Sequence, residues 1–448
     1  MHKRIHEIWL SLCCTPGTPT FANLKDAFKT PADIYTSTEK EIRRAVGPNC
    51  SDCARLFSRD LTRAEQIYDY CVKKEINIVS YYDKEYPENL RTIPTPPVLL
   101  YYRGSLPDFA RHFVCAVVGT RSLTEYGRVN TFRIAQELAQ AGAIVVSGMA
   151  IGIDGVAHAA ALSAGGETVA VLGCGIDVCY PEVHQTLARA IVKSGCVMTE
   201  YPPGTRPDRY NFPTRNRLIS GLAHATVMME GSEKSGALIT ARHAKKQGRL
   251  VFAFPGNVTS KGSEATNLLI KNGAHMIENS SDIFDMIDNP YLWPALKTEN
   301  VDFNRPLNMM ETLRKYSVGC VTPTEDFYYI PKGQRPKPAF AKERPKPKEE
   351  DKIEKLEPLL SVGEVVLDAK DAVPENLKEE PETKNDNVFD RDMMRVYKKI
   401  PVTGSCKIDS LVDEQTDYRQ VMITLVKLRV LSLVKILPGD NVARMIVT

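Results

Sequence analysis

The sequence has no long apolar run and little excess of either charge. Its best candidate for a membrane span, Ala143 to Ile153, is followed at once by Asp154, whereas a spanning helix needs about 20 apolar residues. The short apolar run near the start carries Glu7, so we expect neither a signal peptide nor a membrane anchor, and we expect a cytoplasmic protein. With 58 Lys and Arg against 55 Asp and Glu, the formal charge is +3, which excludes a histone-like polycation. Any phosphate binding must therefore come from a local patch.

The sequence also lacks the usual nucleotide-binding and metal-binding motifs. Gly173 and Gly175 begin a glycine pattern, but Val178 stands where a dinucleotide fingerprint needs a third glycine. No glycine loop ends in Gly-Lys-Ser or Gly-Lys-Thr, which argues against ATP hydrolysis of the P-loop kind. Eleven cysteines include one close pair of the metal-ligand type, Cys50 and Cys53, with no second pair at a usual spacing. We expect reduced thiols, no metal and no cofactor.

Helical periodicity runs through residues 1–108 and predicts a small helical domain of the SAM or helix-hairpin-helix type. A turn at Pro16 and Gly17 separates its first two helices. Contact with a nucleic-acid backbone and plain packing both stay open for this domain. Its end, residues 98–102, reads as an edge strand that leads into the next domain.

Residues 109–290 alternate apolar runs with helical stretches, which is typical of a doubly wound, mostly parallel α/β sheet. The runs are continuous rather than alternating, as expected for strands that are buried on both faces. Six such strands are predicted, at 113–118, 143–146, 168–172, 196–199, 225–229 and 249–254.

The last two regions differ sharply in composition. Residues 296–388 are rich in Lys, Glu and Pro and predict a partly disordered linker, because such a tract buries too little apolar surface to order itself. Residues 389–448 predict three helices and a hairpin, the pattern of a winged-helix domain. DNA binding, protein binding and plain packing all stay open for that domain.

Glycine follows five of the six predicted strands. The carboxyl ends of parallel strands share one edge of a sheet, where ligands bind. Glycine also lets backbone N–H groups approach a phosphate closely, and a following helix N-terminus favours an anion. This edge of the sheet is therefore the predicted ligand surface, with glycines at Gly119, Gly148, Gly173, Gly231 and Gly256.

A basic and aromatic segment runs from Arg206 to Arg217. Its four arginines stand against one acid, Asp208, with Tyr210 and Phe212 between them. Arginine binds phosphate oxygens through paired hydrogen bonds, and an exposed ring stacks on a base. The segment therefore favours single-stranded nucleic acid as a ligand.

Internal roles remain open for part of this segment. Arg215 or Arg217 could pair with Glu200 or Glu230 inside the domain, and Phe212 could belong to the core. These alternatives would remove residues from the binding surface without removing the surface itself.

No catalytic set assembles from the sequence. Asp154 and His158 lie one helical turn apart and could serve a nucleophile, but a packed histidine is the more common outcome. Ser235 and Thr240 lie at a helix start, where a hydroxyl caps the helix. We expect a protein that is not an enzyme.

A series of short motifs in the predicted sheet domain resembles the core of the DNA-processing protein A family, called DprA or Smf. The order of the motifs carries the resemblance, which covers about residues 110–290. The motifs are 118–121, 147–154, 171–177, 180–181, 200–204, 211–221, 230, 235–241, 255–256 and 267–274.

The resemblance implies an extended Rossmann-like fold that binds and protects single-stranded DNA. It implies loading of the RecA recombinase onto that strand in natural transformation and homologous recombination, and a homodimer. Carried over motif by motif, the implied strand-binding residues are Gly119, Arg121, Ser147, Gly148, Arg209, Asn211, Phe212, Arg215 and Arg217. The implied dimer contact lies near Leu268, Leu269 and Ile270.

Two other functions compete with this hypothesis. Rossmann-like enzymes that cleave nucleoside monophosphates bind in the same crevice, but they need a Pro-Gly-Gly-x-Gly-Thr loop, and the segment after Glu230 does not supply it. A winged-helix adaptor with the sheet domain as a ligand sensor is the second alternative, and preference for duplex DNA would support it.

Overall fold

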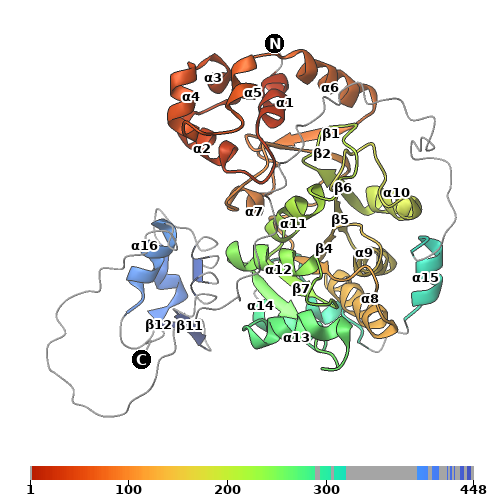
Figure 1. Ribbon diagram of the computed structural model, residues 1–448. Helices are drawn as coiled ribbons and strands as arrows, with labels where there is room; N and C mark the ends of the chain where they lie inside the picture. The colour runs from red at the N-terminus through yellow and green to blue at the C-terminus, as the bar shows by residue number, and fades with distance from the viewer. Residues whose placement is uncertain are drawn as a thin grey trace. The chain divides into compact units, whose positions relative to one another are not determined.

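The computed structural model divides into two compact units, Met1–Phe340 and Ala341–Thr448 (Figure 1). The structure describes residues 3–287, 293–303, 307–318, 391–401, 406–412, 421, 424–425, 428, 434–437 and 441–444.

The first part of the larger unit is helical, as the periodicity predicted. Trp9, Leu24, Ile34 and Leu56 are buried and form its centre. The Thr38 hydroxyl accepts a hydrogen bond from the backbone N–H of Glu41, and the Glu41 carboxylate accepts one from the backbone N–H of Thr38. This capping box begins the fourth helix. The helices are α1 (Lys3–Cys13), α2 (Thr20–Ala27), α3 (Pro31–Thr36), α4 (Glu39–Val46), α5 (Cys53–Ser58) and α6 (Thr62–Lys73).

A nine-stranded, mostly parallel sheet forms the rest of this unit, in the order β1-β2-β6-β5-β4-β3-β7-β8-β9. The six predicted strands are confirmed as β3 to β8, and the α/β class with them. β3 is buried at all five positions, which explains its continuous apolar sequence. The strands are β1 (Asn77–Ser80), β2 (Leu99–Gly104), β3 (Val114–Val118), β4 (Ile144–Ser147), β5 (Thr168–Val171), β6 (Gly195–Thr199), β7 (Ala225–Met228), β8 (Leu250–Ala253) and β9 (His275–Met276).

The strand predicted at residues 98–102 is confirmed as β2, but its predicted place at the edge of the sheet was wrong. β2 pairs antiparallel with β6 on one side and with β1 on the other. The outer neighbour β1 has four residues and an exposed first position. Its apolar run is therefore too short to be predicted as a strand from the sequence.

Helices cover both faces of the sheet, which makes it doubly wound. Figure 1 shows α8, α9 and α10 on one face and α11 and α12 on the other. The chain runs from β3 outward to β6 and then returns through α11 to β7, on the other side of β3. The order of strands therefore reverses next to β3, where open α/β sheets bind ligands. The helices are α7 (Glu88–Arg91), α8 (Glu125–Gln140), α9 (Ile153–Ser163), α10 (Gln185–Ser194), α11 (Asn211–Leu222), α12 (Ala237–Lys246), α13 (Glu264–Lys271) and α14 (Ser281–Ile287), with short turns η1 (Glu182–His184) and η2 (Lys261–Ser263).

The segment after α14 packs on the same unit. Trp293 meets Phe113 and His224 at the amino ends of the strands, with ring centres 5.1 and 5.2 Å away. α15 (Met309–Lys315) lies against α9. The first residues of the predicted linker are thus part of the folded unit, and residues 319–388 lie outside the described residues.

The smaller unit contains a helix and a small sheet. The predicted hairpin strands pair antiparallel, with Leu437 opposite Asn441. The third predicted helix, at 418–429, is described at residues 421, 424, 425 and 428 alone, so the winged-helix domain stays a prediction. The elements are α16 (Arg391–Lys399), β10 (Cys406–Lys407), η4 (Ile408–Leu411), β11 (Val434–Leu437) and β12 (Asn441–Arg444).

Neither a candidate membrane span nor a candidate metal site occurs in the ranges that the structure describes. Within them, no helix combines the length and the apolar character that a membrane crossing requires. The same ranges hold no group of three or more His, Cys, Asp or Glu side chains that could bind a metal ion.

Candidate nucleic-acid interface

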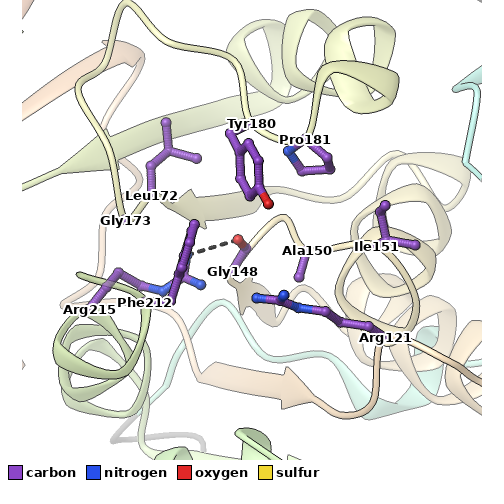
Figure 2. Close-up of a pocket in the computed structure, with 10 residues that line it drawn as sticks. All are labelled: Arg121, Gly148, Ala150, Ile151, Leu172, Gly173, Tyr180, Pro181, Phe212 and Arg215. Carbon is purple, nitrogen blue, oxygen red and sulfur yellow. Dashed lines mark hydrogen bonds between the residues drawn. The ribbon is translucent and has the colours of Figure 1, made fainter. Parts of the chain in front are cut away.

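A pocket opens at the carboxyl ends of β3, β4 and β5 (Figure 2). The loops after these three strands supply most of its lining, and the first turn of α11 supplies the rest. It therefore lies beside the point where the strand order reverses. The lining residues are Arg121, Gly148, Ala150, Ile151, Leu172, Gly173, Tyr180, Pro181, Phe212 and Arg215.

Two aromatic rings and one arginine form the wall of the pocket. The ring centres of Tyr180 and Phe212 lie 5.4 Å apart, with a 31° angle between the planes. The guanidinium carbon of Arg121 lies 5.6 Å from the centre of the Phe212 ring. Figure 2 shows the phenol oxygen of Tyr180 and the guanidinium of Arg121 both directed into the space beside Phe212. Tyr180 is 40% exposed and the Arg121 side chain is exposed as well, so a ligand can reach both.

The floor of the pocket is a buried charge cluster. Nη1 of Arg215 donates hydrogen bonds to the carbonyl oxygens of Gly148, at 2.8 Å, and Val171. Asp154 faces the same guanidinium: burial raises the pKa of its carboxyl group, and Arg215 partly opposes that rise. The loop passes so tightly between them that a Cβ on Gly148 would lie 2.6 Å from Arg215 Nη2 and 2.8 Å from Asp154 Oδ2.

Arg217 takes the internal role that the sequence left open. Its guanidinium forms a bidentate ion pair with Glu200, with N–O distances of 2.8 and 2.7 Å. Both side chains are 5% exposed, and Nε of Arg217 also donates to Thr95 Oγ1. Arg217 therefore joins α11 to the end of β6, and its buried guanidinium is directed at Glu200 instead of at the surface.

Arg209 and Tyr210 lie at the surface just before α11. Nη2 of Arg209 donates to the Tyr210 hydroxyl at 2.7 Å, and its guanidinium carbon lies 4.8 Å from the ring centre. Tyr210 is 57% exposed. A cation beside an exposed ring can hold a phosphate and a base of the same strand.

Three further residues that the family resemblance implies do not line the pocket but lie in the elements around it: Ser147, Asn211 and Gly119. Ser147 is buried, and its hydroxyl donates to the carbonyl oxygen of Val117 at 2.7 Å. Asn211 is buried at the start of α11. Gly119 lies so close to α9 that a Cβ would meet Ile153 Cγ1 at 2.5 Å. These positions shape the loops around the pocket.

The sequence did not predict that the Glu230 side chain lies next to β3, at the point where the order of strands reverses. Its Oε2 accepts a hydrogen bond from the backbone N–H of Thr124 at 2.9 Å, at the start of α8. A Cβ on Gly127 would lie 1.9 Å from that oxygen, and one on Gly262 would lie 2.3 Å from Oε1. An internal carboxylate thus takes the helix N-terminus that binds phosphate in dinucleotide-binding folds.

Tyr180 was also missed as a wall of the pocket. Tyr180 belongs to the motif at residues 180–181, but it lies between β5 and α10, far in sequence from the arginine-rich segment. The sequence alone therefore does not indicate that Tyr180 and Phe212 meet in the fold. The signal that could have found it is its position beyond the carboxyl end of β5, the same edge that carries Arg121 and Gly148.

The implied dimer residues lie on α13. Leu269 belongs to the buried core of the sheet domain, and Ile270 packs against that core. Leu268 is half-buried. A homodimer through this helix stays a prediction.

The two histidines near the pocket are packed residues. His158 is buried, and its Nδ1 lies 2.7 Å from Thr168 Oγ1, whose own hydroxyl donates to Val145. Burial lowers the pKa of His158 to about 3, so the imidazole is neutral. Nδ1 of His184 lies 2.9 Å from the carbonyl oxygen of Met149. Asp154 interacts with Arg215 instead of forming a catalytic pair with His158.

The chain is similar to known proteins over its sheet domain. Residues 77–288 match the family model described as DNA recombination-mediator protein A. The chain is 37% identical over 231 residues to the DNA processing protein DprA of Bacillus subtilis, covering 52% of this chain and 75% of that protein. It is 38% identical over 226 residues to DprA of Streptococcus pneumoniae, covering 50% and 79%. An X-ray structure of DprA from S. pneumoniae aligns with a TM-score of 0.54 and 32% identity, over 64% of this chain and 98% of that one. This chain therefore belongs to the DNA-processing protein A (DprA/Smf) family of DNA recombination mediators.

Proposed function

We propose that this protein binds and protects single-stranded DNA, and loads a recombinase of the RecA class onto it, without catalysing a reaction. The observation that carries the proposal is the pocket wall of Phe212, Tyr180 and Arg121, where a stacking surface and a cation meet at a sheet edge. Membership of a family of recombination mediators supports two proposed partners, a recombinase of the RecA class and a second copy of this chain in a homodimer. Asp154 and His158, the pair that could serve a nucleophile, are both engaged in internal contacts, with Arg215 and with Thr168.

The pocket favours a single strand over a duplex for a geometric reason. A base stacks on Phe212 only when one of its faces is free, and duplex bases have both faces covered by their neighbours. When a base takes that position, the Arg121 guanidinium leaves the ring and becomes available to the adjoining phosphate. Arg209 and Tyr210 extend the same surface along the strand.

A nucleotide-processing enzyme is the weaker candidate. Glu230 already supplies an anion to the N-terminus of α8, and Gly127 lies against its carboxylate. A nucleotide phosphate there would meet a buried negative charge, which is strongly unfavourable.

Removal of the stacking ring is the first test. Replacement of Phe212 by Ala is expected to weaken binding of a labelled oligo-dT of about 35 nucleotides by about 1–3 kcal/mol, because one base loses its aromatic partner. Fluorescence anisotropy with single-stranded and duplex probes measures the loss and the strand preference. Preference for duplex DNA, with the variant unchanged, would contradict the proposal and favour the adaptor hypothesis.

Removal of the pocket cation is the second test. Replacement of Arg121 by Ala should reduce the dependence of log K on log salt by about 0.7, the value for one phosphate contact on a single strand. Arg128→Ala is the matched control, since Arg128 pairs with Glu125 on α8 and does not line the pocket. Equal salt slopes for both variants would remove Arg121 from the proposed interface.

A further inference from the structure

Residues 202–210 form a partly exposed loop, here called the strand loop, that carries the exposed residues Arg206, Arg209 and Tyr210. It is attached to the loop after β5 at two points. The backbone N–H of Gly204 donates to Asp177 Oδ1 at 2.8 Å, and the N–H of Gly175 donates to the carbonyl oxygen of Thr205, also at 2.8 Å. The strand loop therefore takes its position from Asp177 and its neighbours.

The second oxygen of Asp177 reaches the helical first part of the same unit, α1 to α6 (residues 3–73), here called the helical module. Its Oδ2 accepts a hydrogen bond from the hydroxyl of Tyr70, on α6 of the helical module, at 3.1 Å. The turn around Asp177 is closely packed, since a Cβ on Gly175 would lie 2.8 Å from Asp177 Oδ1 and 2.9 Å from the Gly204 nitrogen. One carboxylate thus joins the helical module to the strand loop.

The helical module also lies close to the start of α11, the helix that follows the strand loop. Gly17, in the turn between α1 and α2, has a φ of +80°, and a Cβ there would lie 2.9 Å from Thr214 Cγ2 on α11. That position is in the first turns of α11, directly after Tyr210. The helical module thus lies near the segments on both sides of the strand loop in sequence, Asp177 with its neighbours before it and α11 after it.

We infer that Asp177 is a positioning residue for strand binding, and that the helical module raises strand affinity through it without touching the strand. The inference rests on the proposed function. A loop that is already ordered loses less conformational entropy when a strand binds, so part of the cost of association is met beforehand. Residues that hold Arg206 and Arg209 in place then contribute to affinity although they do not contact the DNA themselves.

The test uses the full chain and the oligo-dT probe. Tyr70→Phe removes one hydroxyl and is expected to weaken binding about fivefold, the effect of one hydrogen bond. Asp177→Ala removes both bonds and is expected to weaken it about tenfold or more. Asp177→Asn should restore binding, because its amide can accept from Gly204 and donate to the Tyr70 oxygen. Tyr35→Phe is the matched control, since the Tyr35 hydroxyl donates to the backbone carbonyl oxygen of Arg59 within the module, and this variant should leave affinity unchanged.

A double-mutant cycle separates positioning from general destabilisation. In an Arg206→Ala, Arg209→Ala background, Tyr70→Phe should have almost no further effect on binding, because the groups that it positions are gone. An undiminished fivefold loss in that background, or a normal affinity for Asp177→Ala, would overturn the inference. If the unmodified chain itself did not bind oligo-dT, the proposed function would fail, and the outcome would be distinct from a failure of the positioning role.

Discussion

Replacement of Glu200 by Ala is expected to lower the free energy of unfolding of the larger unit by about 3–5 kcal/mol, because it leaves a buried guanidinium without its counter-charge. Arg217 is 5% exposed and directs both terminal nitrogens at Glu200. Thr95, its other partner, is a neutral acceptor. Urea unfolding monitored by circular dichroism measures the change.

Two comparison variants test the physical reason for that loss. In Glu200→Leu combined with Arg217→Met, both charges are absent, and the double variant should be more stable than Glu200→Ala. Glu125→Ala removes a surface partner of Arg128, whose side chain is 33% exposed, and should cost less than about 1 kcal/mol. A Glu200→Ala loss no larger than that of Glu125→Ala would show that the buried pair does not stabilise the fold.

The central strands could be predicted because burial on both faces leaves a continuous apolar signal. β3, with five buried positions, is the clearest case. The outer strand β1 could not, because its sequence is short and its first position is exposed. The same reason accounts for the error at β2: nothing in the sequence near residue 99 shows that another strand lies outside it.

The candidate site was predictable where a residue follows directly from a strand end. Arg121 and Gly148 each follow a predicted strand, and the structure brings them into one pocket with Phe212. Arg215 and Arg217 were not separable in the sequence, since both are arginines on one helix. Their roles depend on which carboxylate lies near them, and that is decided by tertiary packing.

Arg215 connects stability to the pocket and gives the second large effect. Replacement by Met is expected to lower the free energy of unfolding by about 3–5 kcal/mol at neutral pH, because Asp154 stays buried without a counter-charge. Asp154 is 6% exposed. The same change removes the hydrogen bond to the Gly148 carbonyl, so binding of oligo-dT should weaken as well. Urea unfolding and fluorescence anisotropy measure the two effects.

The pH dependence of this variant identifies Asp154 as the cause. Burial raises the pKa of Asp154, and Arg215 opposes the rise, so the variant has a higher Asp154 pKa than the parent protein. An acid whose pKa is raised by folding destabilises the fold fully above its folded-state pKa, and this destabilisation disappears as the pH falls from the folded-state to the unfolded-state pKa. The stability difference between variant and parent should therefore be largest at neutral pH and shrink as the pH falls through the raised pKa. Asp154→Asn in the Arg215→Met background should recover much of the stability at neutral pH and flatten the pH profile. A difference that stays constant with pH would assign the loss to packing of the Arg215 side chain instead of to the uncompensated carboxylate.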